Sequence, residues 1–392
     1  MPSSPGPDAF PPELRPTGTR IGVYLHLPFC AKRCGYCSFN TAPYAPVAMK
    51  RLLDALRAEI DLVAAAPWAR SIGIASIFVG GGTPSLATEE QMASLLEPLS
   101  RRFRIERGAE ITVECNPESV TQDRLAGYRC AGVNRISLGV QSLDDAVLAS
   151  LNRLHSASAA RAAFDAARRA GFDNISADLI YGLPDLDVET WADTVRRVLE
   201  WSPEHLSAYA LTLDEGSVWH AAGIGGLPPE EVVTSQYTAL TGLAAEAGYE
   251  HYEISNYARP GRRSTHNQIY WHAREYVGLG PGASGFLGDV RYTNAKPVER
   301  YAALVAAHQL PIESHETLTR RQRLAERLIL GLRLADGVPA DWLAERLDLE
   351  SRRLTAVLDA WRERELIVEN AGRVRLSEAG FLLSDALFVE LL

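Results

Sequence analysis

The chain has 392 residues, of which 46% are hydrophobic and 23% are charged, and its formal net charge is −9. This length exceeds what one hydrophobic core usually supports, so we expect one large domain and one smaller domain. The hydrophobic content excludes an intrinsically disordered chain. Nucleic acid is not an expected partner, because a sequence-independent grip on phosphates needs clustered Lys and Arg, not an acidic chain.

The N-terminus combines two features that bear on location. Residues 1–20 are rich in Pro and Gly and predict a flexible tail, and they lack the apolar segment of a signal peptide. No apolar run in the chain reaches the roughly 20 residues that span a bilayer. We therefore expect a cytoplasmic protein.

Short apolar runs alternate with helical segments rich in Ala, Leu, Arg and Glu. The six runs are 21–27, 74–80, 110–115, 134–139, 175–182 and 205–212. This alternation predicts an α/β fold with parallel strands, either an open doubly wound sheet or a barrel. In both, a ligand binds at the carboxyl ends of the strands. We assign residues 21–250 to this domain and residues 251–312 to a connecting region.

The pattern changes in residues 313–392. Helical patterns are predicted over 320–337, 339–348 and 350–367, followed by a short hairpin. Three helices and a hairpin are typical of a winged helix. Such units often bind DNA, but the acidic chain favours a packing or partner-docking module.

Three of the five cysteines lie close together. Cys30, Cys34 and Cys37 follow the first predicted strand, whereas Cys115 and Cys130 stand alone and are expected to be buried as small apolar residues. Three thiolates in one loop can hold a [4Fe-4S] cluster and leave one iron open for a ligand. The alternatives are a zinc site, which would need a fourth Cys or His, and three incidental thiols.

Glycine and polar residues recur where the predicted strands end. The second strand leads into Gly80, Gly81, Gly82 and Thr83, where backbone groups can approach a ligand closely. The strand ends and loops that follow carry Glu114, Gln141, Arg153 and Asp178. Each alone could be a helix cap or an exposed charge, but their recurrence favours one shared pocket.

The cysteine loop, with its CxxxCxxC spacing, resembles the radical S-adenosylmethionine (SAM) superfamily. The segments YLHLPFC, GYCSFN, FVGGGTPS, VECNPES, GVQS, DLIYGLP and HNQIYW occur in the order of its coproporphyrinogen III oxidase-like (HemN/HemW) family. This resemblance implies a partial (β/α)6 TIM-type barrel, a winged-helix-like C-terminal domain, and a [4Fe-4S] cluster whose open iron chelates SAM. It also implies that SAM contacts Tyr24, Tyr36, Gly81, Gly82, Thr83, Glu114, Gln141, Arg153 and Asp178.

Three features are similar to the heme-chaperone branch of that family. Phe39 stands where the dehydrogenases carry a fourth cysteine, and the short N-terminus does not resemble their longer arm. The HNxxYW motif of the chaperones is matched by His266, Asn267, Tyr270 and Trp271, expected on a strand or loop. An imidazole beside aromatic rings suits heme, although a core histidine among packing aromatics has the same pattern. His251 and His272 are alternative ligands.

The resemblance implies a heme chaperone that binds heme, the cluster and SAM, receives heme from a donor and delivers it to acceptor proteins. The second hypothesis is oxidative decarboxylation of coproporphyrinogen III or another radical SAM reaction, and the third is a zinc-stabilised scaffold. Peripheral contact with a membrane is conceivable for a heme carrier, although no basic amphipathic helix indicates it.

Overall fold

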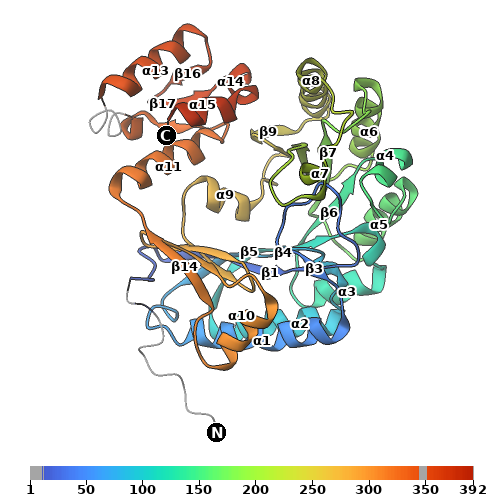
Figure 1. Cartoon of the computed structure of the whole chain (residues 1–392), viewed down its shortest axis with the longest axis vertical. Helices are drawn as coiled ribbons and strands as arrows, with labels where there is room; N and C mark the ends of the chain where they lie inside the picture. Colours follow the sequence, from blue (N-terminus) through green and yellow to red (C-terminus); the bar gives the residue numbers. More distant parts are fainter. Residues whose placement is uncertain (1–10, 12, 344–350, 392) are drawn as a thin grey trace.

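The centre of the molecule is a mostly parallel β-sheet (Figure 1). The computed structural model describes residues 11, 13–343 and 351–391. Six parallel strands lie side by side in chain order: β1 (Arg20–Leu27), β4 (Gly73–Gly81), β5 (Arg104–Cys115), β6 (Arg135–Gln141), β7 (Ile175–Tyr181) and β8 (His205–Ala210). All six predicted strands are therefore confirmed. β5 begins earlier than predicted, at Arg104.

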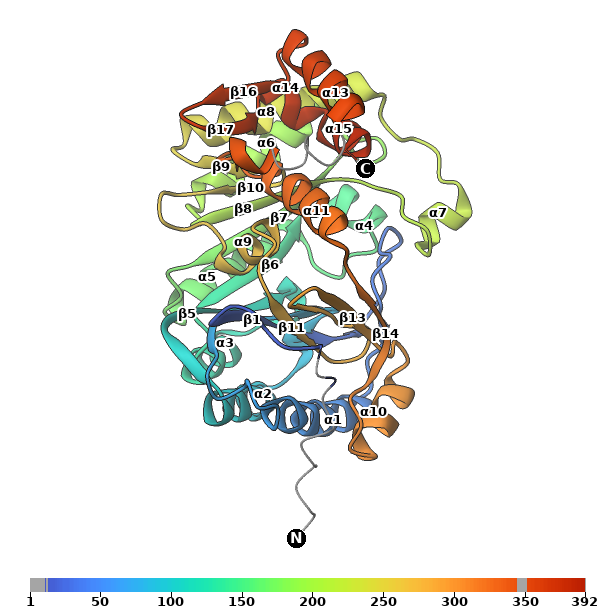
Figure 2. The ribbon, with the colours of Figure 1, turned by 90° about the vertical axis from the view of Figure 1, so that its left-hand side faces the viewer.

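Helices connect these strands and cover the outer face of the sheet. They are α1 (Pro46–Ala64), α2 (Glu89–Arg102), α3 (Gln122–Cys130), α4 (Asp145–Ser150), α5 (Ala157–Arg169) and α6 (Val188–Glu200), with α8 (Glu230–Glu246) after β8. The short helix α7 (Val218–Ala222), between β8 and α8, lies instead against the cysteine loop, where Trp219 N–H donates to Gly35 O at 3.0 Å (Figure 2). Local signals set their starts: Thr88 and Gln91 form a capping box at α2. No described helix has both the length and the apolar character needed to cross a membrane.

Antiparallel strands extend both edges of the sheet. Beyond β8 lie β10 (Asn256–Ala258) and β9 (Glu250–Glu253). On the other side, β1 pairs in parallel with β11 (Tyr276–Leu279), which leads to β12 (Ser284–Leu287), β13 (Val290–Asn294) and β14 (Ile312–Thr317), with α10 (Val298–Ala306) before β14. Because β9 and β14 do not pair with each other, the sheet stays an open, partial barrel, as predicted.

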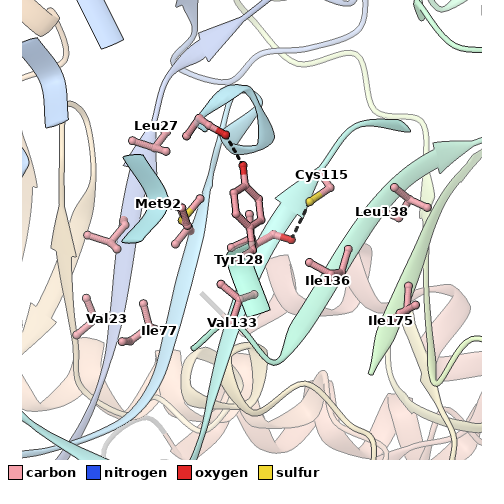
Figure 3. Packing of buried hydrophobic residues seen from close by; sticks show 14 of the residues in the cluster. Val23, Leu27, Ile77, Met92, Cys115, Tyr128, Val133, Ile136, Leu138 and Ile175 are labelled. Carbon is pink, nitrogen blue, oxygen red and sulfur yellow. Dashed lines mark hydrogen bonds between the residues drawn. The ribbon is translucent and has the colours of Figure 1, made fainter. Parts of the chain in front are cut away.

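The hydrophobic core lies between the sheet and the outer helices (Figure 3). Val23 of β1 and Ile77 of β4 pack in one cluster with Met92 of α2 and Tyr128 of α3. The hydroxyl of Tyr128 is buried, and it donates to the carbonyl of Ala87 at 2.5 Å. Burying each large side chain of this kind contributes about 1.5–3 kcal/mol. Since side chains alternate along a strand, the opposite face of each strand is free to carry polar groups.

The segment before β1 is packed against the barrel. Leu14 is 2% exposed and lies in a small cluster with Val290 and Tyr292. The backbone N–H groups of Thr17 and Gly18 donate to the carboxylate of Glu275 at 2.7 and 2.8 Å. The sequence predicts a flexible tail as far as residue 20, whereas residues 13–19 are held by these contacts. The rest of that tail, residues 1–10 and 12, lies outside the described residues.

The C-terminal domain packs on the barrel near β9 (Figure 2). It contains α11 (Arg320–Leu332), α13 (Ser351–Glu363), α14 (Glu378–Leu382) and α15 (Ser384–Glu390), with an antiparallel sheet of β15 (Val338–Pro339), β17 (Arg373–Leu376) and β16 (Ile367–Asn370). The predicted hairpin is β16–β17. The helix predicted over 339–348 lies partly outside the described residues. Ala335 N–H donates to Tyr252 O at 2.9 Å, which joins this domain to the barrel.

One buried carboxylate links four segments at the edge of the barrel. Glu59 of α1 accepts hydrogen bonds from Gly280 N at 2.8 Å, Asn294 Nδ2 at 2.7 Å and the Tyr301 hydroxyl at 2.5 Å. Burial raises the pKa of Glu59 to about 7, although these three donors lower it. The carboxylate therefore holds α1, β13 and α10 together with the turn after β11.

We expect Glu59→Leu to lower the free energy of unfolding by about 2–4 kcal/mol, because it leaves buried donors facing an apolar side chain. In the folded protein the pKa of Glu59 is raised to about 7 from its ordinary value of 4.5, so the stability it contributes is complete below pH 4.5 and is lost as the pH rises through 7. Glu59→Gln stays uncharged and should show a weaker fall in melting temperature over that range. Identical pH profiles for the wild type and Glu59→Gln would contradict this.

Candidate functional site

The inner faces of the strands and the loops at their carboxyl ends surround a cavity of about 460 Å³. It contains most of the residues that the sequence singles out. The predicted site residues that line it are Cys30, Cys34, Tyr36, Cys37, Gly81, Gly82, Thr83, Glu114, Gln141, Arg153, Asp178 and Asn267. The predicted residues outside its lining are Tyr24, His266, Tyr270 and Trp271. The tertiary structure thus brings together residues that are up to about 240 positions apart in the sequence.

Pairing of two short strands fixes the base of the cysteine loop. Cys30 ends the short strand β2 (Phe29–Cys30), which pairs with β3 (Ala42–Pro43) beyond the loop. Within the loop, Cys37 N–H donates to Cys34 O at 3.3 Å, which forms a tight turn. All three thiols are half-buried and free. A pinned loop with three free thiols is suited to hold a cluster at the mouth of the barrel.

The two isolated cysteines differ from each other. Cys115 is buried, as predicted, whereas Cys130 is exposed, so the prediction for Cys130 was wrong. The physical reason is its place in α3: Cys130 is the last residue of that helix, and the buried positions of the helix are Leu125 and Tyr128.

The electrostatic setting of the loop favours a metal cluster over free thiolates. Burial raises the pKa of Cys30 to about 11 and also raises that of Cys37, so both thiols need iron or a nearby cation to ionise. Arg153 supplies one cation, with Nη1 at 3.7 Å from Cys34 Sγ. Among the described residues, no three Cys, His, Asp or Glu side chains converge on a single metal ion. A [4Fe-4S] cluster does not require such convergence, because each thiolate binds a different iron.

The glycine loop after β4 lies directly against the cysteine loop. Gly82 N–H donates to Leu27 O and Thr83 N–H donates to Phe29 O, each at 2.8 Å. A Cβ on Gly82 would lie 2.6 Å from the carbonyl oxygen of Pro28, and Gly81 has a φ of +123°, so both positions require glycine. The two loops therefore form one rigid edge of the cavity.

Two half-buried carboxyl groups face the cavity below this edge. Glu114 accepts a hydrogen bond from Gly81 N at 3.0 Å, and burial raises its pKa to about 7. Asp178 accepts from Ser137 Oγ at 2.7 Å and Ser176 Oγ at 2.9 Å, and burial raises its pKa as well. Such groups can accept hydrogen bonds from the hydroxyl or ammonium groups of a polar cofactor.

Arg153 and Gln141 shape the other side of the cavity. Arg153 Nη2 donates to Asn116 Oδ1 at 2.8 Å and to Gly139 O at 3.0 Å, which fixes its guanidinium beside Cys34. Gln141 ends β6 with a φ of +64°, a conformation that non-glycine residues adopt rarely and mostly at functional sites.

The two predicted tyrosines have different surroundings. Tyr36 lines the cavity within the cysteine loop and contacts Trp219 edge to face, with 6.0 Å between ring centroids. Tyr24 instead lies beneath Phe78, a lining residue, and its hydroxyl is 3.0 Å from His26 Nδ1. Tyr36 is thus placed to touch a ligand in the cavity, and Tyr24 to support its wall.

The HNQIYW segment is a helix, α9 (Thr265–Trp271), and not the strand or loop that we predicted. Two features start it: the side chain of Ser264 accepts from Asn267 N, and Glu110 of β5 accepts from Thr265 N at 2.9 Å and His266 N at 3.0 Å. A carboxylate near the first N–H groups stabilises a helix start. Neither the cap at Ser264 nor the contribution of Glu110 was predicted from the sequence.

His266 is a core histidine with both ring nitrogens occupied. It is 1% exposed, with Nδ1 at 2.8 Å from Ser76 Oγ and Nε2 at 2.8 Å from the Tyr270 hydroxyl. Phe78 stacks on its ring at 5.0 Å and separates it from the cavity. Burial, aided by the charge of Arg135, lowers the pKa of His266 to about 3, so the ring is neutral. In this conformation neither nitrogen is available to an iron.

The other aromatic and histidine candidates lie near the C-terminal domain. Trp271 packs under the guanidinium of Arg333, 4.6 Å from the ring centroid. His251 stacks on Tyr257 at 4.3 Å, with its Nε2 at 3.2 Å from Ile254 O. His272 is half-buried at the end of α9. None of the three residues lines the cavity.

Sequence reasoning missed several cavity residues. The largest is Arg135, with Asn116, Ser207 and Tyr209 beside the predicted ones. For Arg135 a signal existed: in the buried run of β6 it is the charged residue, and it shares the inward face with Ser137. To use that signal, one must know which face of β6 points into the cavity, and the sequence pattern alone does not give this.

Comparisons with known proteins agree with this geometry. The family model of the radical SAM superfamily matches residues 24–198, and that of the HemN C-terminal domain matches residues 318–383. The solved structure of coproporphyrinogen III oxidase (HemN) from Escherichia coli superposes with a TM-score of 0.83 at 24% identity, covering 96% of this chain and 90% of that one. That likeness establishes the fold.

Curated relatives extend over nearly the whole chain. The heme chaperone HemW of Mycobacterium tuberculosis is 38% identical over 388 residues, 97% of each protein. The heme chaperone HemW of Bacillus subtilis is 33% identical, covering 93% of this chain and 97% of the relative. The mouse radical S-adenosyl methionine domain-containing protein 1, mitochondrial, is 35% identical over 84% of this chain and 76% of its own length. The chain therefore belongs to the HemW family within the radical SAM superfamily.

Proposed function

We propose that this protein is a heme chaperone that binds heme, a [4Fe-4S] cluster and SAM and delivers heme to acceptor proteins. The observation that carries the proposal is the cavity, which joins a three-cysteine loop to a glycine loop and two half-buried carboxyl groups. The chain that forms it is similar to HemW over nearly its full length. The cysteine loop and the cavity would serve the cluster and SAM, and the HNQIYW segment would serve heme.

The donor set fits the cluster and SAM. Cys30, Cys34 and Cys37 would hold three irons, and the fourth iron would offer an open coordination position and, when the cluster is reduced, one electron. The glycine loop would leave room for the backbone to approach SAM. Glu114 and Asp178 would accept hydrogen bonds from its polar groups, and Arg153 would balance the negative charge of the thiolates.

The alternative of a coproporphyrinogen III dehydrogenase is less well supported. Phe39 occupies the place of a fourth cysteine, lines the cavity, and is 66% exposed. An exposed phenyl ring at this rim offers an apolar contact and no thiol. The likeness to the HemN structure concerns the fold, so it does not favour either activity.

For heme, we propose that His266 becomes the axial ligand after it leaves its present partners. Ser76 and Tyr270 each occupy one ring nitrogen, so the ring must give up at least one hydrogen bond before it can bind iron. Asn267 already faces the cavity, and Tyr270 and Trp271 add ring surface for a flat macrocycle. The heme-competent state would thus be a minor conformation of the free protein.

Location and partners follow from the same function. We propose a cytoplasmic protein that receives heme from a donor and passes it to acceptor proteins. Peripheral contact with a membrane would occur when an acceptor resides there. Nucleic acid is not a proposed partner, since the net charge of −9 does not suit a phosphate backbone.

Replacing Cys37 by Ala should abolish stable cluster binding, since two thiolates do not hold a cluster whose fourth iron is already open. Iron and sulfide analysis after anaerobic reconstitution measures the loss. Cys130→Ala is the matched control because Cys130 is exposed outside the loop, and it should keep a full complement. A full iron and sulfide content in Cys37→Ala would show that the loop is not the cluster site.

The reconstituted protein should bind heme and transfer it to an apo-acceptor, while coproporphyrinogen III should remain unconverted in the presence of SAM and reductant. Heme transfer is followed by the Soret band of the acceptor, and porphyrinogens are separated by chromatography after oxidation. Protoporphyrinogen IX formed over many turnovers would reject the chaperone in favour of the dehydrogenase.

The variants of α9 test the axial ligand. Tyr270→Phe removes the partner of His266 Nε2, so it should favour the released ring and raise heme affinity several-fold, whereas His266→Ala should weaken binding and shift the Soret band. Cluster content should stay unchanged in both variants. An unaltered Soret band and affinity in His266→Ala would return His266 to a packing role and make His272 and His251 the next ligands to replace.

A further inference from the structure

Arg135 is a buried cation that the described part of the chain leaves without an ion pair. Its side chain is 2% exposed, and its Nε is buried with no hydrogen-bond partner. A buried guanidinium is costly unless its charge and its N–H donors are satisfied. The residue nevertheless lines the cavity, so the unused donors face space that a ligand can enter.

The strand register places Arg135 at the deep end of the cavity. It is the first residue of β6 and lies opposite Thr112, whereas Ser137 lies opposite Glu114. Arg135 is therefore two residues, or about 7 Å, further from the strand ends than the level of Glu114. The cysteine loop leaves from the opposite, carboxyl end of its strand. A ligand that reaches Arg135 must extend inward from the region of the cysteines.

The nearby carboxyl groups do not neutralise Arg135 by contact. Glu114 accepts from Gly81 N, and Asp178 accepts from Ser137 and Ser176. Burial raises the pKa of both carboxyl groups, and the positive charge of Arg135 lowers it, which means that the guanidinium acts on them through space. Its N–H donors thus remain available.

A second polar side chain shares this end of the cavity. Asn267 lines the cavity, and its backbone N–H is bonded to Ser264, so the helix does not use its side-chain amide for capping. Glu110 holds the start of α9, and it precedes Thr112, the residue opposite Arg135, by two positions on β5. The charge of Arg135 also lowers the pKa of His266, the neighbour of Asn267 in α9. Arg135 and Asn267 therefore offer guanidinium and amide donors to the same deep space.

We propose that Arg135 and Asn267 form a carboxylate-binding subsite at the deep end of the cavity. A guanidinium can donate two parallel hydrogen bonds to one carboxylate, and the amide can donate a third. This assignment rests on the proposed heme-carrying function and assigns a contact to its cargo, since a propionate arm of a tetrapyrrole is a carboxylate on a flexible stem. SAM also carries one carboxylate, so the experiment separates these two sources.

The experiment compares heme with heme dimethyl ester, whose two carboxylates are blocked, on the full-length reconstituted protein. The wild type should bind heme about tenfold or more tightly than the ester. In Arg135→Met the affinity for heme should fall to that for the ester, while affinity for the ester and for SAM stays constant. If Arg135→Met instead bound SAM more weakly and kept the wild-type preference for heme over its ester, the bound group would be the carboxylate of SAM and not a propionate.

Two controls separate binding from folding. Arg51→Met removes an exposed arginine of α1 and should keep the preference for heme over its ester. Arg135→Met removes an uncompensated buried charge, so its melting temperature without ligand should be equal to or above that of the wild type. Arg135→Lys keeps the charge and should keep part of the preference for heme.

The outcomes also distinguish this subsite from the wider function. Equal binding of heme and ester by the wild type, unaltered in Arg135→Met, would reject the subsite and leave heme binding intact. A lower melting temperature in Arg135→Met, with equal losses for heme and ester, would make Arg135 a structural residue. Failure of the wild type to bind either compound would reject the heme-carrying function itself.

Discussion

The division of each barrel strand into an apolar outer face and a polar inner face determines the rest of this structure. On β6, Ile136 and Leu138 belong to the core beneath the outer helices, whereas Arg135 and Ser137 line the cavity. The outer face supplies the hydrophobic stabilisation, so the inner face does not have to. It can therefore carry buried charges whose cost the surrounding core offsets. A barrel packed with aliphatic side chains on both faces would be more stable but would have no interior site.

The two ends of the barrel are built for different tasks. At the carboxyl end, the backbones of the cysteine and glycine loops are hydrogen-bonded to each other. This contact leaves no room for a side chain at Gly82, so the geometry of the three thiols depends on that glycine. On the inner side, α9 is held by Glu110 and by the hydrogen bonds of His266. Its far end reaches the C-terminal domain through Trp271 and Arg333. Helix α9 thus connects the interior of the barrel to the C-terminal domain. A movement of α9 that released His266 would change contacts in both.

Ionisable side chains lie along the cavity from its mouth to its deep end. Near its mouth Arg153 lies beside Cys34, and in the middle Glu114 has a pKa of about 7. At the deep end, the Nε of Arg135 has no hydrogen-bond partner among the described residues. The protonation of Glu114 can therefore respond to whatever binds beside it. A cavity of this kind favours an elongated ligand, or two ligands in line, with polar groups of opposite sign along its length.

The sequence alone determined the strands, the cysteine spacing and the polar residues at the strand ends, because these depend on local pattern: two-residue alternation, helix caps and a loop short enough to gather three thiols. Resemblance to a family then supplied the cofactors. The tertiary structure alone decided which side chains share a space. It placed Arg135 in the cavity and buried His266 behind Phe78. It also made HNQIYW part of a helix whose first N–H groups donate to Glu110 of β5, and it packed Leu14 against Tyr292. Each of these depends on residues far apart in the chain, and their contacts follow from strand order and register, which no local pattern encodes.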